Sequence, residues 1–276
     1  MSLDDLHRRF PGAWQPLDGG LSHHVWRASA LGGDVVIRAP QEGPTSPLFP
    51  RDAEGEWAVL QHLESTELAP EPVERCEGAL VTRYVRGQAW QGDFAAAGAV
   101  FRKLHGMTRP AGLRCIGSDP VEAGRAVLAE CIDTALVLIA PPPVASPGPT
   151  VLLHGDPTPA NMLMRDGAAV LIDWQCPAVG PAAHDLALFL SPAMHLLHGG
   201  APPGEEDRAA FFTAYGEPEP DEGLAAALHW MIACHCQWRI EQGEEAYRPA
   251  LVAEVTALRR AAGPRSRRLR PAPPRG

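Results

Sequence analysis

Residues 154–173 read HGDPTPANMLMRDGAAVLID, and this stretch decides the fold. Asp166-Gly167 is a strong two-residue turn signal, and a short apolar run lies on each side of it. Pairing the two runs about this turn sets Asn161 opposite Ile172 and beside Asp173. Side chains at such positions lie within about 6 Å of each other. The stretch therefore predicts a hairpin whose open end brings an amide and a carboxylate together.

The same stretch has the residues that phosphoryl transfer requires. Transfer to a hydroxyl needs a carboxylate that receives or orients the hydroxyl, and oxygen ligands that hold Mg²⁺ on the triphosphate. Asp156 precedes Asn161 by five residues, the spacing of base and metal ligand in kinase catalytic loops. His154 stands where such loops have their histidine, so we take it and Asp156 as candidate catalytic residues. Each acidic residue taken singly could be structural, whereas the set favours phosphoryl transfer.

Four motifs together resemble the aminoglycoside phosphotransferase and choline kinase family, which has a protein-kinase-like fold. They are His154-Gly155-Asp156, Asn161, Ile172-Asp173-Trp174 and Asp185-Leu186-Ala187. The resemblance spans most of the chain, is most specific over residues 152–190, and leans towards choline and thiamine kinases. It implies Asp156 as catalytic base, Asn161 and Asp173 as Mg²⁺ ligands, and ATP or GTP as phosphate donor. Asp185 is expected to brace the catalytic loop by hydrogen bonds.

The rest of the chain predicts a bilobal α+β fold. Residues 1–86 alternate short β-like runs with one helix over 52–64, which predicts a small lobe with an antiparallel sheet. The resemblance implies that this lobe binds the nucleotide. Residues 87–262 predict a larger helical lobe with the catalytic loop and the acceptor site. Its expected helices cover 94–105, 120–139, 183–197, 205–215, 222–242 and 246–262. Residues 263–276, rich in arginine and proline, are expected to form a disordered tail.

Arg38 and Glu56 are candidate residues of the nucleotide site. Glu56 shares a predicted helix face with Leu60 and Leu63, where a carboxylate without a cation would be costly. Arg38 ends a predicted buried strand, where kinases place the lysine that touches the α- and β-phosphates. The one lysine of the chain, Lys103, reads as a helix surface residue. We expect Arg38 to pair with Glu56 and to contact phosphate; a purely structural pair is the alternative.

Two further segments complete the predicted nucleotide site. Residues 19–22 resemble the family's phosphate-covering turn, with Gly20 and Ser22 as candidate contacts, although His23 stands where relatives often have asparagine. A plain glycine hairpin is the alternative. The strand over 80–85 resembles the hinge between lobes, so the backbone at Arg83 and Val85 is expected to bond the base.

The acceptor is predicted to be a small hydroxylated molecule, such as choline, thiamine, an amino alcohol, a sugar or an aminoglycoside. Trp238 and Glu241 lie three residues apart on one helix face, and Glu245 follows on that face. This face could hold an amine or ammonium group through cation–π and charge contacts. A core tryptophan beside a solvated acidic edge is the alternative.

Net charge, apolar runs and cysteine spacing argue against several classes of protein. The net charge of −9 disfavours a broad nucleic-acid surface, so a phosphate site must be local. The chain lacks a run of about 20 apolar residues that could span a membrane. Residues 1–10 lack the apolar core of a signal peptide, so a cytoplasmic location is expected. The six cysteines lack CxxC pairs, which indicates reduced thiols, and Cys234-His235-Cys236 lacks the second ligand pair of a zinc site.

Two other functions are open at this point. The first is a non-catalytic kinase-fold protein that binds nucleotide or a partner, and the retained Asp156, Asn161 and Asp173 argue against it. The second is a metallohydrolase with His154 and Asp156 as ligands, which would need further histidines at metal-site spacing. The sequence gives no indication of the oligomeric state.

Overall fold

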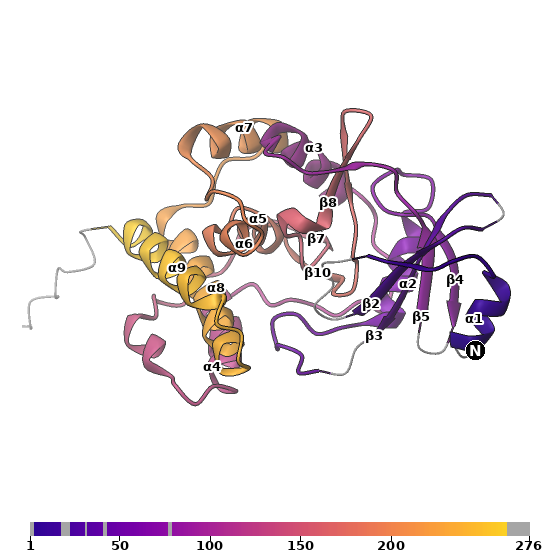
Figure 1. Cartoon of the computed structure of the whole chain (residues 1–276). Coiled ribbons are helices and arrows are strands. Elements are labelled where there is room, and N and C mark those ends of the chain that lie inside the picture. Colours follow the sequence, from indigo (N-terminus) through magenta and orange to yellow (C-terminus); the bar gives the residue numbers. More distant parts are fainter. Residues whose placement is uncertain (1–2, 18–22, 31, 41–42, 77–78, 264–276) are drawn as a thin grey trace, which may run out of the picture.

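The chain folds into two lobes, a smaller one built around a sheet and a larger one built mainly of helices (Figure 1). The computed structural model describes residues 3–17, 23–30, 32–40, 43–76 and 79–263. The arrangement confirms the predicted α+β class with a small antiparallel sheet. The predicted domain limits after residues 86 and 262 stay predictions, and the predicted tail beyond residue 263 lies outside the described residues.

The smaller lobe contains one antiparallel sheet with the strand order β1-β2-β3-β5-β4. Its strands are β1 (Gln15–Pro16), β2 (His23–Ala28), β3 (Val35–Pro40), β4 (Pro72–Cys76) and β5 (Ala79–Arg83). Side chains alternate along β3, so Val35 and Ile37 are buried in the core of the lobe while Val36 and Arg38 point to the opposite face. That face borders the larger lobe, because Val36 and Arg38 line a cavity between the lobes.

Two helices accompany this sheet, α1 (Leu3–Arg9) and α2 (Ala53–His62). Leu6 of α1 is buried against the core face of the sheet. α2 begins after Asp52, whose Oδ1 accepts a hydrogen bond from Gly55 N at 2.9 Å. The apolar side of α2, which includes Val59, packs into the core of the larger lobe. The helix predicted over 52–64 therefore forms, and it connects the two lobes.

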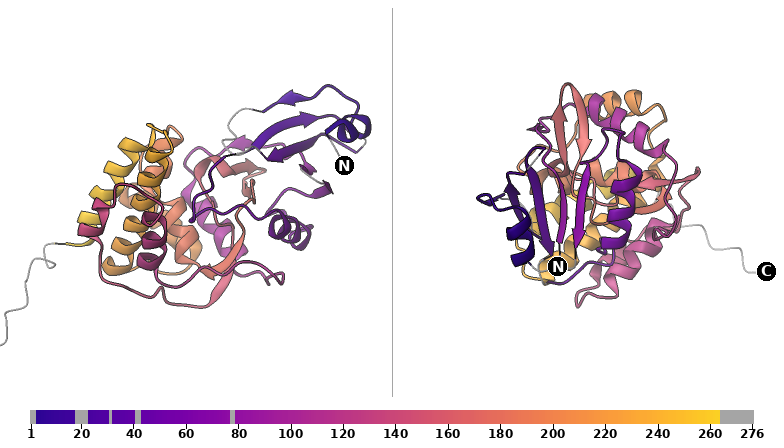
Figure 2. Two further views of the ribbon diagram at one scale, coloured as in Figure 1. Left: turned by 90° about the horizontal axis from the view of Figure 1, so that it is seen from below. Right: turned by 90° about the vertical axis from the view of Figure 1, so that its right-hand side faces the viewer.

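The larger lobe is organised around α8. Its helices are α3 (Phe94–His105), α4 (Pro120–Leu128), α5 (Ala183–Phe189), α6 (Pro192–Leu197), α7 (Glu205–Tyr215), α8 (Glu222–Glu241) and α9 (Tyr247–Ala261), with the 3-10 turns η1 (Ala135–Ile139) and η2 (Pro159–Asn161). α8 packs against α4 and α9, and Trp230 is fully buried there. Figure 2 shows α9 at the end of the molecule opposite the sheet of the smaller lobe. No helix among the described residues is both long and apolar enough to cross a membrane.

Short strands complete the larger lobe. They are β6 (Gln88–Ala89), β7 (Thr150–Leu153), β8 (Met162–Arg165), β9 (Ala168–Leu171) and β10 (Ala178–Pro181). β6, β8 and β9 form one sheet, and β7 pairs with β10 in another. A second apolar core, which includes Phe101, Phe189 and Phe211, lies among α3, α5 and α7. We call residues 154–173 the catalytic segment; it begins directly after β7 and includes β8 and β9.

Two predicted helices are interrupted. The helix predicted over 183–197 divides into α5 and α6, because Ser191 caps α6 and Pro192 takes its first position, where a missing N–H is tolerated. The helix predicted over 120–139 ends after Leu128, and the apolar run that suggested its continuation forms η1. Ile132 between the two is 95% exposed, so apolar periodicity was misleading in this segment.

The connection from β3 to α2 crosses into the larger lobe. We call residues 43–52 the β3–α2 segment. Leu48 is buried in the core around α8, and Ser46 Oγ lies 2.9 Å from His235 Nδ1. The Phe49 ring meets the His235 ring edge-on, with 4.6 Å between centroids. A segment that begins in the smaller lobe is therefore anchored on α8.

Candidate active site

The catalytic segment leaves β7 through a turn that requires glycine. Gly155 has a φ of 83°, which is a left-handed value. A Cβ atom at this position would lie 1.8 Å from the carbonyl oxygen of Cys176. The glycine of the HGD motif therefore lets two backbone segments approach closely.

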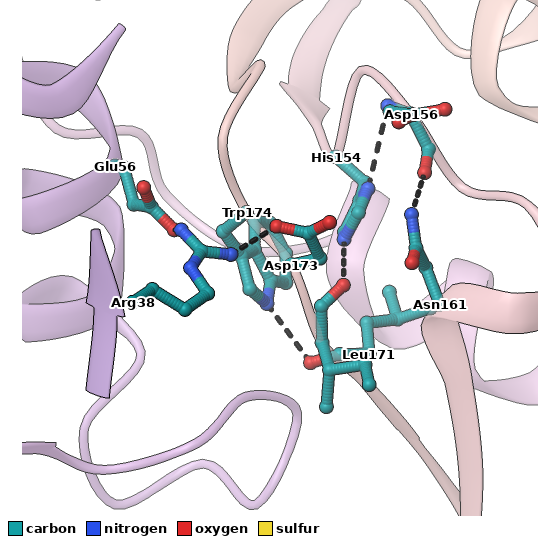
Figure 3. Close-up of polar contacts among 9 residues, drawn as sticks. Arg38, Glu56, His154, Asp156, Asn161, Leu171, Asp173 and Trp174 are labelled. Carbon is teal, nitrogen blue, oxygen red and sulfur yellow. Dashed lines mark hydrogen bonds and ion pairs between the residues drawn. The ribbon is translucent and has the colours of Figure 1, made fainter. Parts of the chain in front are cut away.

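His154, the first residue of the catalytic segment, is buried inside the protein. Its side chain is 0% exposed, and burial lowers the pKa of its imidazole, which is therefore neutral. Nε2 lies 3.0 Å from Ile172 O, and Nδ1 lies 3.3 Å from Asp156 N (Figure 3). Because the carbonyl can only accept and the amide can only donate, the Nε2–H tautomer satisfies both bonds. His154 thus positions the backbone of Asp156, and our prediction of a directly catalytic histidine is corrected to this positioning role.

Asp185 braces the catalytic segment as predicted. Its Oδ2 accepts from His154 N at 2.8 Å, and its Oδ1 accepts from Gly155 N at 3.0 Å. His105 Nε2 lies 3.4 Å from Oδ2, and His105 Nδ1 lies 2.9 Å from Tyr215 Oη. Burial alone would raise the pKa of Asp185, but the hydrogen bond and charge of His105 hold that pKa below its ordinary value. A buried network therefore ties the catalytic segment to α3, α5 and α7.

The predicted hairpin forms about Asp166-Gly167. These two residues have φ values of 52° and 80°, as a type I′ turn requires. β8 and β9 pair about the turn, and the pairing continues as Ile172 N donates to Asn161 O at 2.9 Å. Asn161 and Asp173 therefore lie together at the open end of the hairpin, where both line the same cavities.

Asn161 also fixes the loop that carries Asp156. Its Nδ2 donates to Asp156 O at 2.9 Å, which leaves Oδ1 as the amide atom that could face a metal ion (Figure 3). Burial and the Asp173 carboxylate raise the pKa of Asp156 to about 7. A carboxylate with such a pKa can exchange a proton near neutral pH. The local geometry thus suits Asp156 as a base, with the Asn161 side chain beside it as an oxygen ligand.

Arg38 connects the lobes by ion pairs with Glu56 and Asp173 (Figure 3). The pair with Glu56 confirms the prediction, whereas the pair with Asp173 was not predicted. Burial raises the pKa of Glu56 to about 7 although Arg38 opposes this shift. The Asp173 side chain is 28% exposed, so it remains accessible from the cleft. A divalent ion bound by Asp173 would share that carboxylate with Arg38.

The first cavity, which we call the nucleotide-side cavity, has a volume of about 390 Å³ and lies between the lobes. Its lining includes six predicted residues: Arg38, Glu56, Arg83, Val85, Asn161 and Asp173. Arg83 N donates to Glu71 O at 2.8 Å, so this amide is already engaged, and the base contacts expected at the backbone of Arg83 and Val85 stay predictions. The other predicted contacts, Gly20 and Ser22, lie outside the described residues.

The second cavity, which we call the acceptor-side cavity, has a volume of about 350 Å³. It is bounded by the β3–α2 segment, the catalytic segment, α6, α8 and the start of α9. Asp156 lines this cavity, while Asn161 and Asp173 line both. The two cavities therefore meet at the open end of the β8–β9 hairpin.

Comparison with known proteins agrees with this geometry. A sequence model of the phosphotransferase enzyme family matches residues 13–228. The chain belongs to this family. No curated protein sequence matches the chain significantly. The match confirms the resemblance inferred from the HGD motif. It includes Arg38, Asp156, Asn161 and Asp173, whereas the four lining residues of the acceptor-side cavity from α8 onward lie beyond it.

Solved structures share the fold of this phosphotransferase. A choline/ethanolamine kinase family protein from Mesorhizobium loti is 18% identical over 95% of each chain, with a TM-score of 0.67. A macrolide 2′-phosphotransferase from Brachybacterium faecium is 22% identical, over 91% of this chain and 96% of that one, with a TM-score of 0.59. A spectinomycin phosphotransferase in complex with ADP and spectinomycin is 14% identical, over 92% and 91%, with a TM-score of 0.61. These likenesses confirm the protein-kinase-like fold.

The predicted acceptor residues of this phosphotransferase lie elsewhere. Trp238 is 4% exposed and stacks on the His235 ring in the core around α8. Glu241 accepts hydrogen bonds from Ile132 N at 2.7 Å and Asp133 N at 2.9 Å, which fastens the segment after α4. Within the described part of the chain, the acceptor-side cavity is lined by other residues of this region: His235, Arg239, Glu244 and Tyr247. The alternative interpretation, a core tryptophan beside a solvated acidic edge, therefore describes Trp238 and Glu241 better.

The structure also resolves the cysteine–histidine motif on α8. Cys234 and Cys236 are buried in the surrounding apolar core, and burial raises the pKa of both thiols. Among the described residues, no group of three or more His, Cys, Asp and Glu side chains could hold a metal ion. His235 instead supports the β3–α2 segment through Ser46.

Proposed function

We propose that this phosphotransferase moves the γ-phosphate of ATP or GTP to a hydroxyl group of a small molecule, with Mg²⁺ as cofactor. The observation that carries the proposal is the meeting of two cavities at Asn161 and Asp173, with Asp156 facing the acceptor side. A donor in one cavity and an acceptor in the other would have their reacting atoms at this junction. Family membership supports the same class of reaction.

In the proposed reaction the acceptor hydroxyl lies against the Asp156 carboxylate. The hydroxyl oxygen forms a bond to the γ-phosphorus, and the bond from that phosphorus to the β–γ bridging oxygen breaks, which releases the nucleoside diphosphate. The hydroxyl proton passes to Asp156, whose pKa of about 7 suits this exchange near neutral pH. His154 and Asp185 keep the carboxylate in place through the backbone of the catalytic segment.

The donor atoms around Asp173 fit Mg²⁺. The Asp173 carboxylate and the free oxygen of the Asn161 amide are hard oxygen ligands, and magnesium sites of this kind use few protein ligands together with substrate phosphates. When bound, Mg²⁺ supplies charge neutralisation for the triphosphate. Arg38 would add a second positive charge on the nucleotide side, and its pair with Glu56 keeps it on the cavity face of β3.

A nucleotide donor is supported by the relative whose structure contains ADP, since it shares the fold over most of its length. The nucleotide-side cavity also has a volume suited to a small ligand. We therefore assign the donor to this cavity and the acceptor to the cavity beside Asp156.

The test is ADP release by the purified chain with Mg·ATP and a panel of alcohols. We expect saturable release with at least one alcohol, transfer of phosphate to that alcohol, and loss of both in Asp156→Ala. A thermal-shift measurement with ATP and Mg²⁺ serves as the binding control. Nucleotide binding without transfer to any alcohol or to water would favour a non-catalytic kinase-fold protein.

A further inference from the structure

The acceptor-side cavity contains an ion pair that the proposed phosphate transfer does not use. Arg239 Nη2 donates to Glu244 Oε2 at 2.6 Å, and both residues line the cavity. Asp156, the carboxylate that would face the hydroxyl, lines the same cavity. Arg239 is therefore placed to contact a group on the acceptor itself.

The surroundings of Arg239 leave it able to bind a second acceptor atom. Its side chain is 17% exposed, and its Nε is buried without a hydrogen-bond partner among the described residues. A guanidinium has five N–H donors in a planar fork, and Glu244 engages one terminal nitrogen. Carboxylate and phosphate groups match this fork because they present two oxygens side by side.

Among the described residues, the aromatic rings of the acceptor-side cavity do not form a cage for a cation. The guanidinium carbon of Arg239 lies 5.2 Å from the centroid of the Tyr247 ring, so this ring already contacts a positive charge. Phe49 is turned edge-on to His235. An ammonium group placed beside these rings would also be repelled by Arg239. The arrangement therefore disfavours the cationic acceptors suggested by the sequence.

The two histidines that line the acceptor-side cavity add no charge at neutral pH. Burial lowers the pKa of His235 to about 3 and lowers that of His198, so both rings are neutral at pH 7. Arg51 also lines the cavity, where its Nη2 lies 3.1 Å from Thr45 Oγ1. The charged groups of the described lining are thus Arg51, Arg239 and Glu244, together with Asp156 and Asp173 at the proposed reaction centre.

We infer that the acceptor carries an anionic oxygen group, a carboxylate or a phosphate, which Arg239 binds while the acceptor hydroxyl faces Asp156. The inference rests on the proposed phosphate transfer and specifies its substrate class. The cavity volume of about 350 Å³ is near the lower end for ligand pockets. An acceptor of the size of an amino acid or a monosaccharide fits this volume better than a macrolide does.

The experiment compares acceptors that differ in one group. Glycerol, glycerate and glycerol 3-phosphate provide neutral, carboxylate and phosphate probes, and ethanolamine and choline provide cationic ones. We expect kcat/KM for glycerate or glycerol 3-phosphate to exceed that for glycerol, ethanolamine and choline by about tenfold or more, as a charge-assisted hydrogen bond allows. The better of the two anionic probes identifies the anionic group.

Variants then assign the preference to Arg239. Arg239→Gln should reduce the ratio of kcat/KM for the anionic probe to that for glycerol by about tenfold, and Arg239→Lys should restore part of it. Arg248→Gln is the matched control, because Arg248 pairs with Glu245 at the surface and does not line the cavity. It should leave the ratio unchanged.

The outcomes separate the inference from the proposed function. Turnover of choline, ethanolamine or glycerol that equals or exceeds turnover of the anionic probes overturns the inference and leaves phosphate transfer standing. An Arg239→Gln variant that slows anionic and neutral probes equally overturns it too. Absence of phosphate transfer to these probes, to the wider panel of alcohols and to water, in a chain that stays folded by circular dichroism, rejects the proposed function itself.

Discussion

The two cavities that meet at Asp173 are built in different ways. The nucleotide-side cavity takes Arg38 from a strand face and Glu56 from the next helix, both within one short part of the chain. The acceptor-side cavity gathers residues from the β3–α2 segment, α6, α8 and the start of α9. The two charged residues that the smaller lobe contributes to the nucleotide-side cavity are thus neighbours in the sequence, whereas the lining of the acceptor-side cavity outside residues 154–173 depends on how distant segments pack.

Asp173, which lines both cavities, should give the largest effect. Asp173→Asn keeps the size of the side chain and tolerates the left-handed φ of 62°, but it removes the charge that would hold Mg²⁺. We expect kcat to fall by about a thousandfold, equivalent to several kcal/mol of transition-state stabilisation. Steady-state kinetics against Mg²⁺ concentration measures this. Asp166→Asn, in the exposed hairpin turn, is the control, and unchanged kinetics in Asp173→Asn would exclude the proposed metal role.

The next largest effect is expected at Asp185, which supports the catalytic segment through hydrogen bonds. Asp185→Asn removes the charge that accepts hydrogen bonds from His154 N and Gly155 N, so we expect the free energy of unfolding to fall by about 2 to 3 kcal/mol at pH 7. The pKa of Asp185 is lowered in the folded state, so its stabilising effect is present above the unfolded pKa and is lost as the pH falls through the folded value. Urea unfolding should show the difference from wild type narrowing below about pH 4. A difference independent of pH would contradict this account.

A substitution at Arg38, which lines only the nucleotide-side cavity, should affect the KM for ATP more than the KM for the acceptor. Arg38→Gln removes the positive charge beside the proposed phosphate position, so we expect the KM for ATP to rise by about tenfold and the acceptor KM by much less. Arg38→Lys should recover part of the affinity because it keeps the charge. Both constants come from two-substrate kinetics. A larger effect on the acceptor KM would place Arg38 outside the nucleotide site.

The smallest effect is expected at a residue outside both cavities. Glu241→Gln weakens the two hydrogen bonds that fasten Ile132 and Asp133, and it should lower the free energy of unfolding by about 1 kcal/mol or less. The acceptor KM should stay as in wild type, since Glu241 is not part of the described cavity lining. Differential scanning calorimetry and acceptor kinetics provide the two measurements. A raised acceptor KM would restore the original prediction for this residue.

Prediction succeeded where short-range rules decide the structure. The Asp166-Gly167 turn sets the register of β8 and β9, and that register carries Asp173 to Asn161. Alternation along β3 likewise determines which face Arg38 occupies. Prediction failed along α8, because this helix is buried on most of its surface and apolar periodicity cannot identify the side that borders a cavity.

By itself, the sequence determined the family, the two-lobed class and the hairpin that unites the catalytic residues, because turn chemistry and strand alternation act over a few neighbouring residues. Only the tertiary structure decided that Arg38 also pairs with Asp173, 135 residues further along the chain. It alone decided, too, that the β3–α2 segment reaches α8 and that Arg239 borders the acceptor-side cavity. Contacts of this kind depend on how whole helices and strands pack against one another, and local sequence patterns do not determine that packing.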